Sequence, residues 1–278
     1  MKDFLYQAPE SIKDAISIYQ QFQSSAVIMA GATDIIIRMR DKLISPECVI
    51  DIKRIKALYG IEFSESKGLL IGACSTLNEI AENEYVKRFY PFLAQAAESV
   101  GSKQLRNRAT CAGNIVNASP LADTATPLYV CGAVIEAEGS EGKREIPIDK
   151  FITFVRKVDL KPCEIVTGIR VPHIPGIEGE FFKISRRHEV DLSTVCGTVA
   201  KTGGEYRIAL GAVAPTPVRL KKTEALLSGR KLTASLIAEA AELAKSEISP
   251  IDDVRASRQY RLDMSALIVR RGLERFAS

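Results

Sequence analysis

The sequence predicts an α+β protein made of two parts, and three observations support this fold class. In the first fifty residues, apolar runs at 26–30 and 48–52 alternate with helical patterns. Beyond a segment rich in proline and glycine at 172–180, strand-like runs are followed by helix-like segments. The 278 residues, of which 46% are apolar, can bury the core of one large domain or of two ordinary ones.

The elements of the first part follow from local patterns. Ser11 stands where a helix N-cap would, and apolar residues then repeat at helical spacing up to Tyr19. Residues 76–100 show a helical pattern twice, with Pro91 at the start of the second helix. We also expect a short helix at 35–39, hairpins at 59–73 and 133–148, a helix at 123–131 and a closing strand at 164–172.

The second part is expected to be a small α+β domain because its strands precede its helices. Strands are expected at 180–187, 194–200 and 206–214, and helices at 221–227, 234–248 and 257–276. The segment 172–180 is the best candidate for a domain boundary.

Composition argues against several classes of protein. The 38 basic and 34 acidic residues are spread along the chain, so a net charge of +4 marks neither a nucleic-acid arm nor a disordered tail. The 6 cysteines form no CxxC pair, so we expect buried free thiols and no metal site. The charged N-terminal segment is unlike a signal peptide, and no apolar run approaches ~20 residues, which predicts a cytoplasmic protein without a membrane span.

Two clusters of small residues, AGATD at 30–34 and TCAGN at 110–114, are candidate ligand loops. A loop of small residues before a helix lets a ligand approach the backbone, and its free amides face an anion. Neither cluster contains a Walker or GxGxxG pattern. A dinucleotide pyrophosphate would suit two such turns, with Asp123 accepting a hydrogen bond from a sugar hydroxyl. The alternatives are ordinary tight turns packed against a sheet, and a helix N-cap at Asp123.

Five motifs, in this order, resemble the FAD-binding medium subunit of molybdenum hydroxylases, nearest to the separate FAD subunits of bacterial xanthine dehydrogenases. They are AGATDIIIRMR, RNRATCAGNIVNASPLADTATPL, EIVTGIRVP, FFKISRRHEVDLSTV and GAVAPTPVR, and they cover essentially the whole chain. The resemblance implies a two-part FAD-binding domain of the p-cresol methylhydroxylase (PCMH) and vanillyl-alcohol-oxidase type. This domain would span residues 1–174, with subdomains at about 1–55 and 56–174. A C-terminal domain with a three-stranded sheet and helices would span residues 178–278.

The resemblance also implies which residues bind FAD. The first loop supplies Val27, Ile28, Met29, Ala30, Gly31, Ala32, Thr33 and Asp34. The second supplies Ala109, Thr110, Cys111, Ala112, Gly113 and Asn114, with Ser119 and Asp123 near the sugar. Val166 and Lys183 are expected beside the isoalloxazine ring, where a lysine could stabilise the reduced flavin; without the resemblance, Lys183 would be a solvated strand residue.

Ala32 and Ala112 stand where family members usually carry glycine, in the patterns AGGTD and TxGGN. An added methyl is tolerable where φ is negative, but it strains a left-handed turn by roughly 1 kcal/mol or more. This chain is therefore expected to bind FAD as family members do if Ala32 and Ala112 both fit their backbone conformations.

The mechanism implied by the resemblance is electron relay without catalytic side chains. A large molybdopterin subunit hydroxylates the substrate, a small [2Fe-2S] subunit passes the electrons on, and FAD delivers them to NAD⁺ or another acceptor. Arg186 and Arg187 could help hold FAD or NAD phosphates, and basic stretches at 38–40 and 103–108 could dock on an acidic partner. The alternative is a flavin-free scaffold subunit; nucleic-acid binding is least favoured because the basic stretches lack interleaved aromatics.

Overall fold

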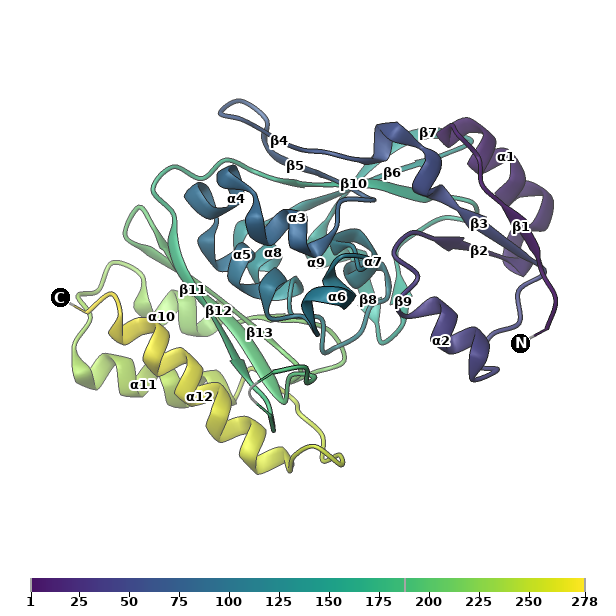
Figure 1. Cartoon of the computed structure of the whole chain (residues 1–278). Coiled ribbons are helices and arrows are strands. Elements are labelled where there is room, and N and C mark those ends of the chain that lie inside the picture. Colours follow the sequence, from purple (N-terminus) through teal and green to yellow (C-terminus); the bar gives the residue numbers. More distant parts are fainter. Residues whose placement is uncertain (1, 188, 278) are drawn as a thin grey trace.

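Residues 2–187 and 189–277 are described by a computed structural model, and its N-terminal part forms a small parallel sheet (Figure 1). The strands of this sheet lie in the order β1 (Leu5–Gln7), β3 (Cys48–Asp51) and β2 (Ala26–Met29). Its helices are α1 (Ile12–Phe22) and α2 (Ile35–Arg40). Three single-turn 3₁₀ helices complete this part: η1 (Gln23–Ser25), η2 (Ile52–Arg54) and η3 (Lys56–Leu58).

Helix α1 begins where the sequence predicts. The Ser11 hydroxyl accepts a hydrogen bond from the Asp14 N–H at 3.1 Å and thereby satisfies one free donor of the first turn. The buried strands β2 and β3 pair in parallel, with Val27 opposite Val49. The loop from β2 to α2 therefore leaves the carboxyl end of a buried strand.

A second sheet of five antiparallel strands follows, in the order β4-β5-β10-β6-β7. It contains β4 (Ile61–Ser64), β5 (Gly68–Gly72), β10 (Ile165–Val171), β6 (Val134–Gly139) and β7 (Gly142–Pro147). The hairpins β4–β5 and β6–β7 confirm the two predicted from the sequence. The closing strand β10 joins them, because it pairs with β5 on one side and with β6 on the other.

The predicted pair of helices between residues 76 and 100 is wrong, because the segment forms three. They are α3 (Leu77–Glu82), α4 (Glu84–Phe89) and α5 (Pro91–Glu98). Asn83 separates the first two: its backbone is extended, and its side chain accepts from the N–H groups of Tyr85 and Val86 at 3.0 and 3.1 Å. An asparagine that caps the next helix ends the preceding one. Pro91 starts α5, as expected.

Short elements fill the space between the second sheet and the C-terminal sheet (Figure 1). The helices are α6 (Lys103–Arg106), α7 (Cys111–Val116), α8 (Ala125–Cys131) and α9 (Ile148–Phe151), and a small ribbon is made of β8 (Ile152–Phe154) and β9 (Lys157–Val158). Two arginines of the C-terminal part bond the end of α8: Arg219 donates to the Tyr129 carbonyl at 3.0 Å and Arg207 to the Val130 carbonyl at 3.2 Å. Cations are favourable at a helix C-terminus. Because both arginines belong to the C-terminal part and α8 belongs to the first, these hydrogen bonds also connect the two parts.

The C-terminal part is a sheet covered by helices. Its antiparallel strands run in chain order: β11 (Glu178–Ile184), β12 (Val195–Thr202), β13 (Glu205–Gly211) and β14 (Val218–Arg219). The helices are α10 (Lys221–Leu227), α11 (Ala234–Lys245) and α12 (Arg258–Glu274). The three predicted strands are present, and the two-residue β14 extends the sheet to four because Leu210 finds a partner in Val218.

Helices cover both faces of this sheet (Figure 1). Helix α12 packs on β12 from one side, while α5 and α8 pack on β11 and β13 from the other. Glycine permits α12 to pack closely on β12: a Cβ on Gly272 of α12 would lie 2.4 Å from the Val199 side chain. One apolar core therefore lies between the C-terminal sheet and α10–α12, and a larger one fills the first part.

All six cysteines are buried free thiols, as predicted. Among the described residues, no helix is both long and apolar enough to cross a membrane, and no group of three or more metal-ligating side chains could hold a metal ion.

Candidate functional site

The two small-residue segments meet in space although about eighty residues separate them. Gly31, in the loop between β2 and α2, lies against the backbone just before α7: a Cβ at this position would be 2.1 Å from the Arg108 carbonyl oxygen. Only glycine permits this approach without displacing one of the segments. The close contact at Gly31 is thus made to protein backbone, which the sequence could not show.

The first loop has free donors and a strained residue. Within the described residues, the backbone N–H groups of Gly31, Ala32, Thr33 and Asp34 donate to no backbone or side-chain acceptor. Ala32 has a φ of 68°, in the left-handed region that favours glycine. The loop therefore keeps the conformation of a glycine turn at an energetic cost.

The second segment is a helix start, which corrects the expectation of a loop at 110–114. Thr110 caps α7, with its hydroxyl accepting from the Gly113 N–H at 3.0 Å, and its carbonyl accepts from the Asn114 N–H at 2.9 Å. Among the described residues, the Ala112 N–H has no acceptor, whereas the Cys111 N–H faces Ser75 across the antiparallel bridge that pairs Thr76 with Thr110. Ala112 is a helical residue with ordinary φ, so its methyl causes no backbone strain.

Side chains of α7 and of its C-cap residue make hydrogen bonds to the surrounding loops. The Asn114 carbonyl oxygen accepts from the Thr124 hydroxyl at 2.6 Å, and the Asn117 amide donates to Asp34 Oδ1 at 3.2 Å. Asp34 also accepts from Arg156 of the β8–β9 turn at 3.1 Å. These contacts fix the helix beside the first loop.

An apolar cavity of about 270 Å³ lies beside both segments. The predicted site residues that line it are Val27, Ile28, Ala30, Ala112, Gly113 and Val166. Tyr19, Ile35 and Leu160 also line it and were not among the predicted site residues, because their helical or apolar patterns indicated only core packing. The tertiary structure therefore gathers β2, α7 and β10 around one space.

A larger cavity of about 930 Å³ lies between the α5–α6 region and the end of β11. Lys183 lines it, together with the basic residues Lys103, Arg106, Arg186 and Arg187. Val166 lines only the apolar cavity, so the structure places Val166 and Lys183 on different cavities.

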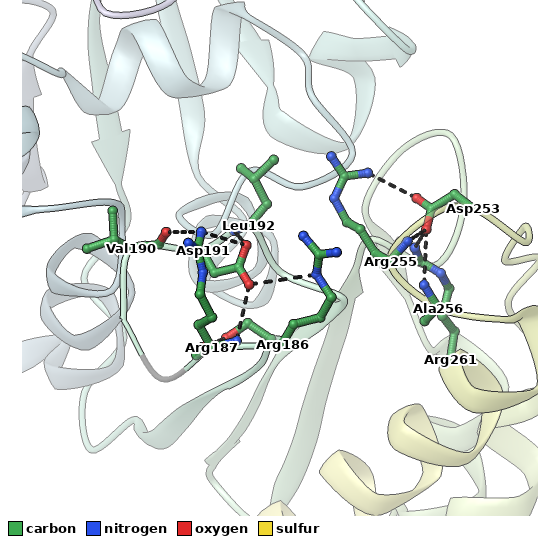
Figure 2. A network of polar contacts seen from close by, with 10 residues as sticks. Arg186, Arg187, Val190, Asp191, Leu192, Asp253, Arg255, Ala256 and Arg261 are labelled. Carbon is green, nitrogen blue, oxygen red and sulfur yellow. Dashed lines mark hydrogen bonds and ion pairs between the residues drawn. The ribbon is translucent and has the colours of Figure 1, made fainter.

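The loop after β11 is held by its own carboxylate, as Figure 2 shows. Asp191 accepts from the backbone N–H groups of Arg187 and Leu192 at 3.2 and 2.9 Å, and it also pairs with the Arg187 guanidinium at 3.6 Å. Arg186 lies 4.0 Å from the same carboxylate. Arg186 and Arg187 therefore line the larger cavity with their guanidinium groups beside Asp191.

Asp123 belongs to a buried polar cluster at the wall of the larger cavity. It accepts from Lys183 Nζ at 2.7 Å and from the Ser193 hydroxyl, and it is only 4% exposed. Burial raises the pKa of Asp123, while Lys183 and Ser193 oppose that shift. Its alternative role as an N-cap is wrong, because Thr124 occupies the N-cap position of α8 and Asp123 turns to the lysine.

Other predicted residues lie outside both cavities. The Met29 side chain packs with Met39 and Val49 in a separate cluster. Cys111 is fully buried, and burial raises the pKa of its thiol to about 12, so it carries no reactive thiolate. The Ser119 hydroxyl accepts from the Leu121 N–H at 3.2 Å within its own turn.

Comparison with known families matches nearly the whole chain. Residues 2–174 match the family described as FAD binding domain in molybdopterin dehydrogenase, and residues 180–276 match the CO dehydrogenase flavoprotein C-terminal domain. The xanthine dehydrogenase FAD-binding subunit of Escherichia coli O157:H7 is 31% identical, over 95% of this chain and 93% of that protein. The carbon monoxide dehydrogenase medium chain of Hydrogenophaga pseudoflava is also 31% identical, over 97% and 96%.

Solved structures show the same fold over the full length. Carbon monoxide dehydrogenase from Hydrogenophaga pseudoflava, in a form that lacks the Mo-pyranopterin moiety, superposes with a TM-score of 0.93 at 32% identity, covering 98% of this chain and 96% of that one. Quinoline 2-oxidoreductase from Pseudomonas putida 86 gives a TM-score of 0.93 at 27% identity, with coverage of 100% and 98%.

Proposed function

We propose, because this chain belongs to the family of FAD binding domains in molybdopterin dehydrogenases, that it is the FAD-carrying electron-transfer subunit of a xanthine dehydrogenase-like complex. FAD, when bound, supplies a centre that accepts electrons and passes them on. The chain itself binds and orients the cofactor and excludes water from part of it.

The convergence of free amides beside an apolar cavity carries this proposal. In the part of the chain that the structure describes, the N–H groups of Gly31 to Asp34 and of Ala112 lack protein acceptors, and they come from two segments held together at the contact between Gly31 and Arg108. Backbone N–H groups that lack protein acceptors suit phosphate oxygens, and an adjacent apolar cavity suits an aromatic ring. The residues present therefore fit a dinucleotide whose pyrophosphate lies between two protein segments.

Individual roles follow from position. We assign the segments Val27 to Asp34 and Ala109 to Asn114 to the phosphate site and the neighbouring apolar cavity, which Val166 of β10 also lines, while the Met29 and Cys111 side chains pack elsewhere. Lys183 offers a cation at the larger cavity, and Asp123 holds that cation in place. Because both carboxylate oxygens of Asp123 already accept from protein donors, we assign Asp123 to holding Lys183 in preference to binding a sugar hydroxyl.

The proposal also includes the partner subunits of the complex and the electron acceptor of the flavin. Relatives named FAD-binding subunit and medium chain support an assembly with a large molybdopterin subunit and a small [2Fe-2S] subunit. The larger cavity, with its basic Lys103, Arg106, Arg186 and Arg187, suits the phosphates of NAD⁺. We place the domain boundary between residues 174 and 178, where the matched family ranges also divide.

Cofactor retention tests the proposal directly. The purified full chain is incubated separately with FAD, FMN and riboflavin, desalted and denatured, and the released flavin is quantified against protein. Recognition through a pyrophosphate predicts retention of FAD far above that of the other two flavins. A colourless chain that releases no FAD, alone or with co-purified partners, would instead support the flavin-free scaffold.

The acceptor needs a separate experiment. The co-purified complex is reduced with xanthine, and the rate of flavin reoxidation is compared with NAD⁺ and with an artificial acceptor. Reoxidation that responds to NAD⁺ supports the nucleotide route; reoxidation by the artificial acceptor alone excludes it.

A further inference from the structure

Asp34 poses an electrostatic problem at the proposed phosphate site. It closes the first loop, whose free N–H groups suit an anion, yet its own side chain is a carboxylate that is 41% exposed. A carboxylate at the end of this loop would repel a pyrophosphate bound to the loop. The repulsion would weaken the affinity for the cofactor unless a cation neutralised the carboxylate.

The compensating cation comes from a distant part of the chain. Arg156, at the turn between β8 and β9, donates through Nη1 to Asp34 Oδ2 at 3.1 Å and to Oδ1 at 3.3 Å. The same nitrogen contacts Asn117 Oδ1, and the Asn117 amide donates to Asp34 Oδ1. The three side chains therefore join the first loop, the end of α7 and the β8–β9 turn.

The backbone fixes the arginine in this position. The Arg156 N–H donates to the Ala118 carbonyl at 2.9 Å, so the turn is attached to the second residue after α7. Arg156 has a φ of 59°, and Ala118 has a φ of 46°. Two non-glycine residues held in the left-handed region show that surrounding contacts impose this arrangement.

We propose that Arg156 is a positioning residue of the cofactor site, which neutralises Asp34 and holds the first loop against α7. The inference rests on the proposed function, because it assumes that the free amides receive phosphates. It adds a residue outside every motif that carries the family resemblance.

Charge neutralisation and simple bracing give different results in a set of full-chain variants. FAD affinity is measured by titrating FAD-depleted protein at low and high ionic strength, and thermal unfolding of the depleted protein is followed in parallel. Arg156→Gln is compared with Lys157→Gln, which removes the same charge one residue later from an exposed side chain that makes no hydrogen bond or ion pair within the described residues. Arg156→Lys keeps the cation, and Arg156→Gln with Asp34→Asn removes both charges.

We expect Arg156→Gln to raise the dissociation constant of FAD roughly fivefold at low ionic strength, which is the upper end for an exposed pair, and less in high salt. Lys157→Gln and Arg156→Lys should stay near the wild-type value. The double variant should bind better than Arg156→Gln alone, because the repelling carboxylate is gone.

Three outcomes overturn the inference. Equal affinities for Arg156→Gln and Lys157→Gln would show that Arg156 has no specific role at the site. A double variant that binds no better than Arg156→Gln would show that Arg156 does not act by neutralising Asp34. Wild-type protein that retains no FAD would overturn the proposed function itself, and the inference would fall with it.

Discussion

Lys183 donates a 2.7 Å hydrogen bond to Asp123 across the boundary between the C-terminal sheet and the helices of the first part. The lysine also donates to the Ser99 carbonyl at 2.9 Å, and the side chains of Lys183 and Asp123 are only 14% and 6% exposed. A buried pair of this kind matters most when one partner is removed, because the other is then an uncompensated charge.

Asp123→Ala should therefore destabilise the chain by about 3 kcal/mol, which urea unfolding would measure. Asp123→Leu combined with Lys183→Met should recover most of this loss, since it removes both charges. Asp3→Ala is the matched control, because this exposed carboxylate makes no hydrogen bond or ion pair with any residue that the structure describes. Equal stability of Asp123→Ala and Asp3→Ala would show that the pair contributes nothing.

Replacing the two unusual alanines by glycine should have opposite effects. Ala32→Gly relieves a left-handed residue at φ 68° and should raise the free energy of unfolding by about 0.5 to 1 kcal/mol. Ala112→Gly loosens the first turn of α7 and should lower it by about 0.5 to 1 kcal/mol. Parallel denaturant titrations of the depleted protein would measure both; a shift of the same sign in the two variants would contradict the assigned backbone conformations.

Gly31→Ala should separate the two segments of the site. Its Cβ would lie 2.1 Å from the Arg108 carbonyl, so we expect about 2 to 3 kcal/mol of destabilisation and loss of FAD retention. Gly113→Ala is the comparison, because its Cβ would meet only the Thr110 hydroxyl at 2.9 Å. Calorimetry of both FAD-depleted variants separates the causes: unchanged stability of Gly31→Ala would mean that the glycine makes room for a ligand alone.

Acid should weaken the C-terminal part through Asp253, whose contacts Figure 2 shows. Burial would raise the pKa of Asp253, but bonds from the Arg255 N–H and the Arg261 guanidinium outweigh it and lower the pKa to about 2. Arg261 is 2% exposed and also donates to the Ala212 carbonyl at 3.0 Å.

Because the folded pKa of Asp253 is below the unfolded one, its stabilisation is complete above about pH 4 and is lost as the pH falls toward about 2. Because Asp253 is an exposed residue and solvent screens its charge, the contribution is about 1 kcal/mol. The difference in unfolding free energy between wild type and Asp253→Asn should shrink over that interval. A difference that is the same at both ends would contradict the pairing with Arg261.

Local patterns predicted most of the elements. Ser11 caps α1, Pro91 begins α5 and the two hairpins form as expected, because caps, proline and alternating apolar residues act within a few positions. The break at Asn83 was missed because a capping asparagine inside a continuous helical pattern also looks like an ordinary polar helix residue.

The sequence by itself determined the class of protein and pointed to the two segments that we propose as the cofactor site, since loops of small residues before helices and their order along the chain are properties of the sequence. Only the tertiary structure decided that Gly31 accommodates the Arg108 carbonyl, that Asp123 pairs with Lys183, and that Arg156 reaches Asp34. The reason is physical: these contacts join residues 60 to 122 positions apart, and their distance and burial depend on packing that no local pattern encodes.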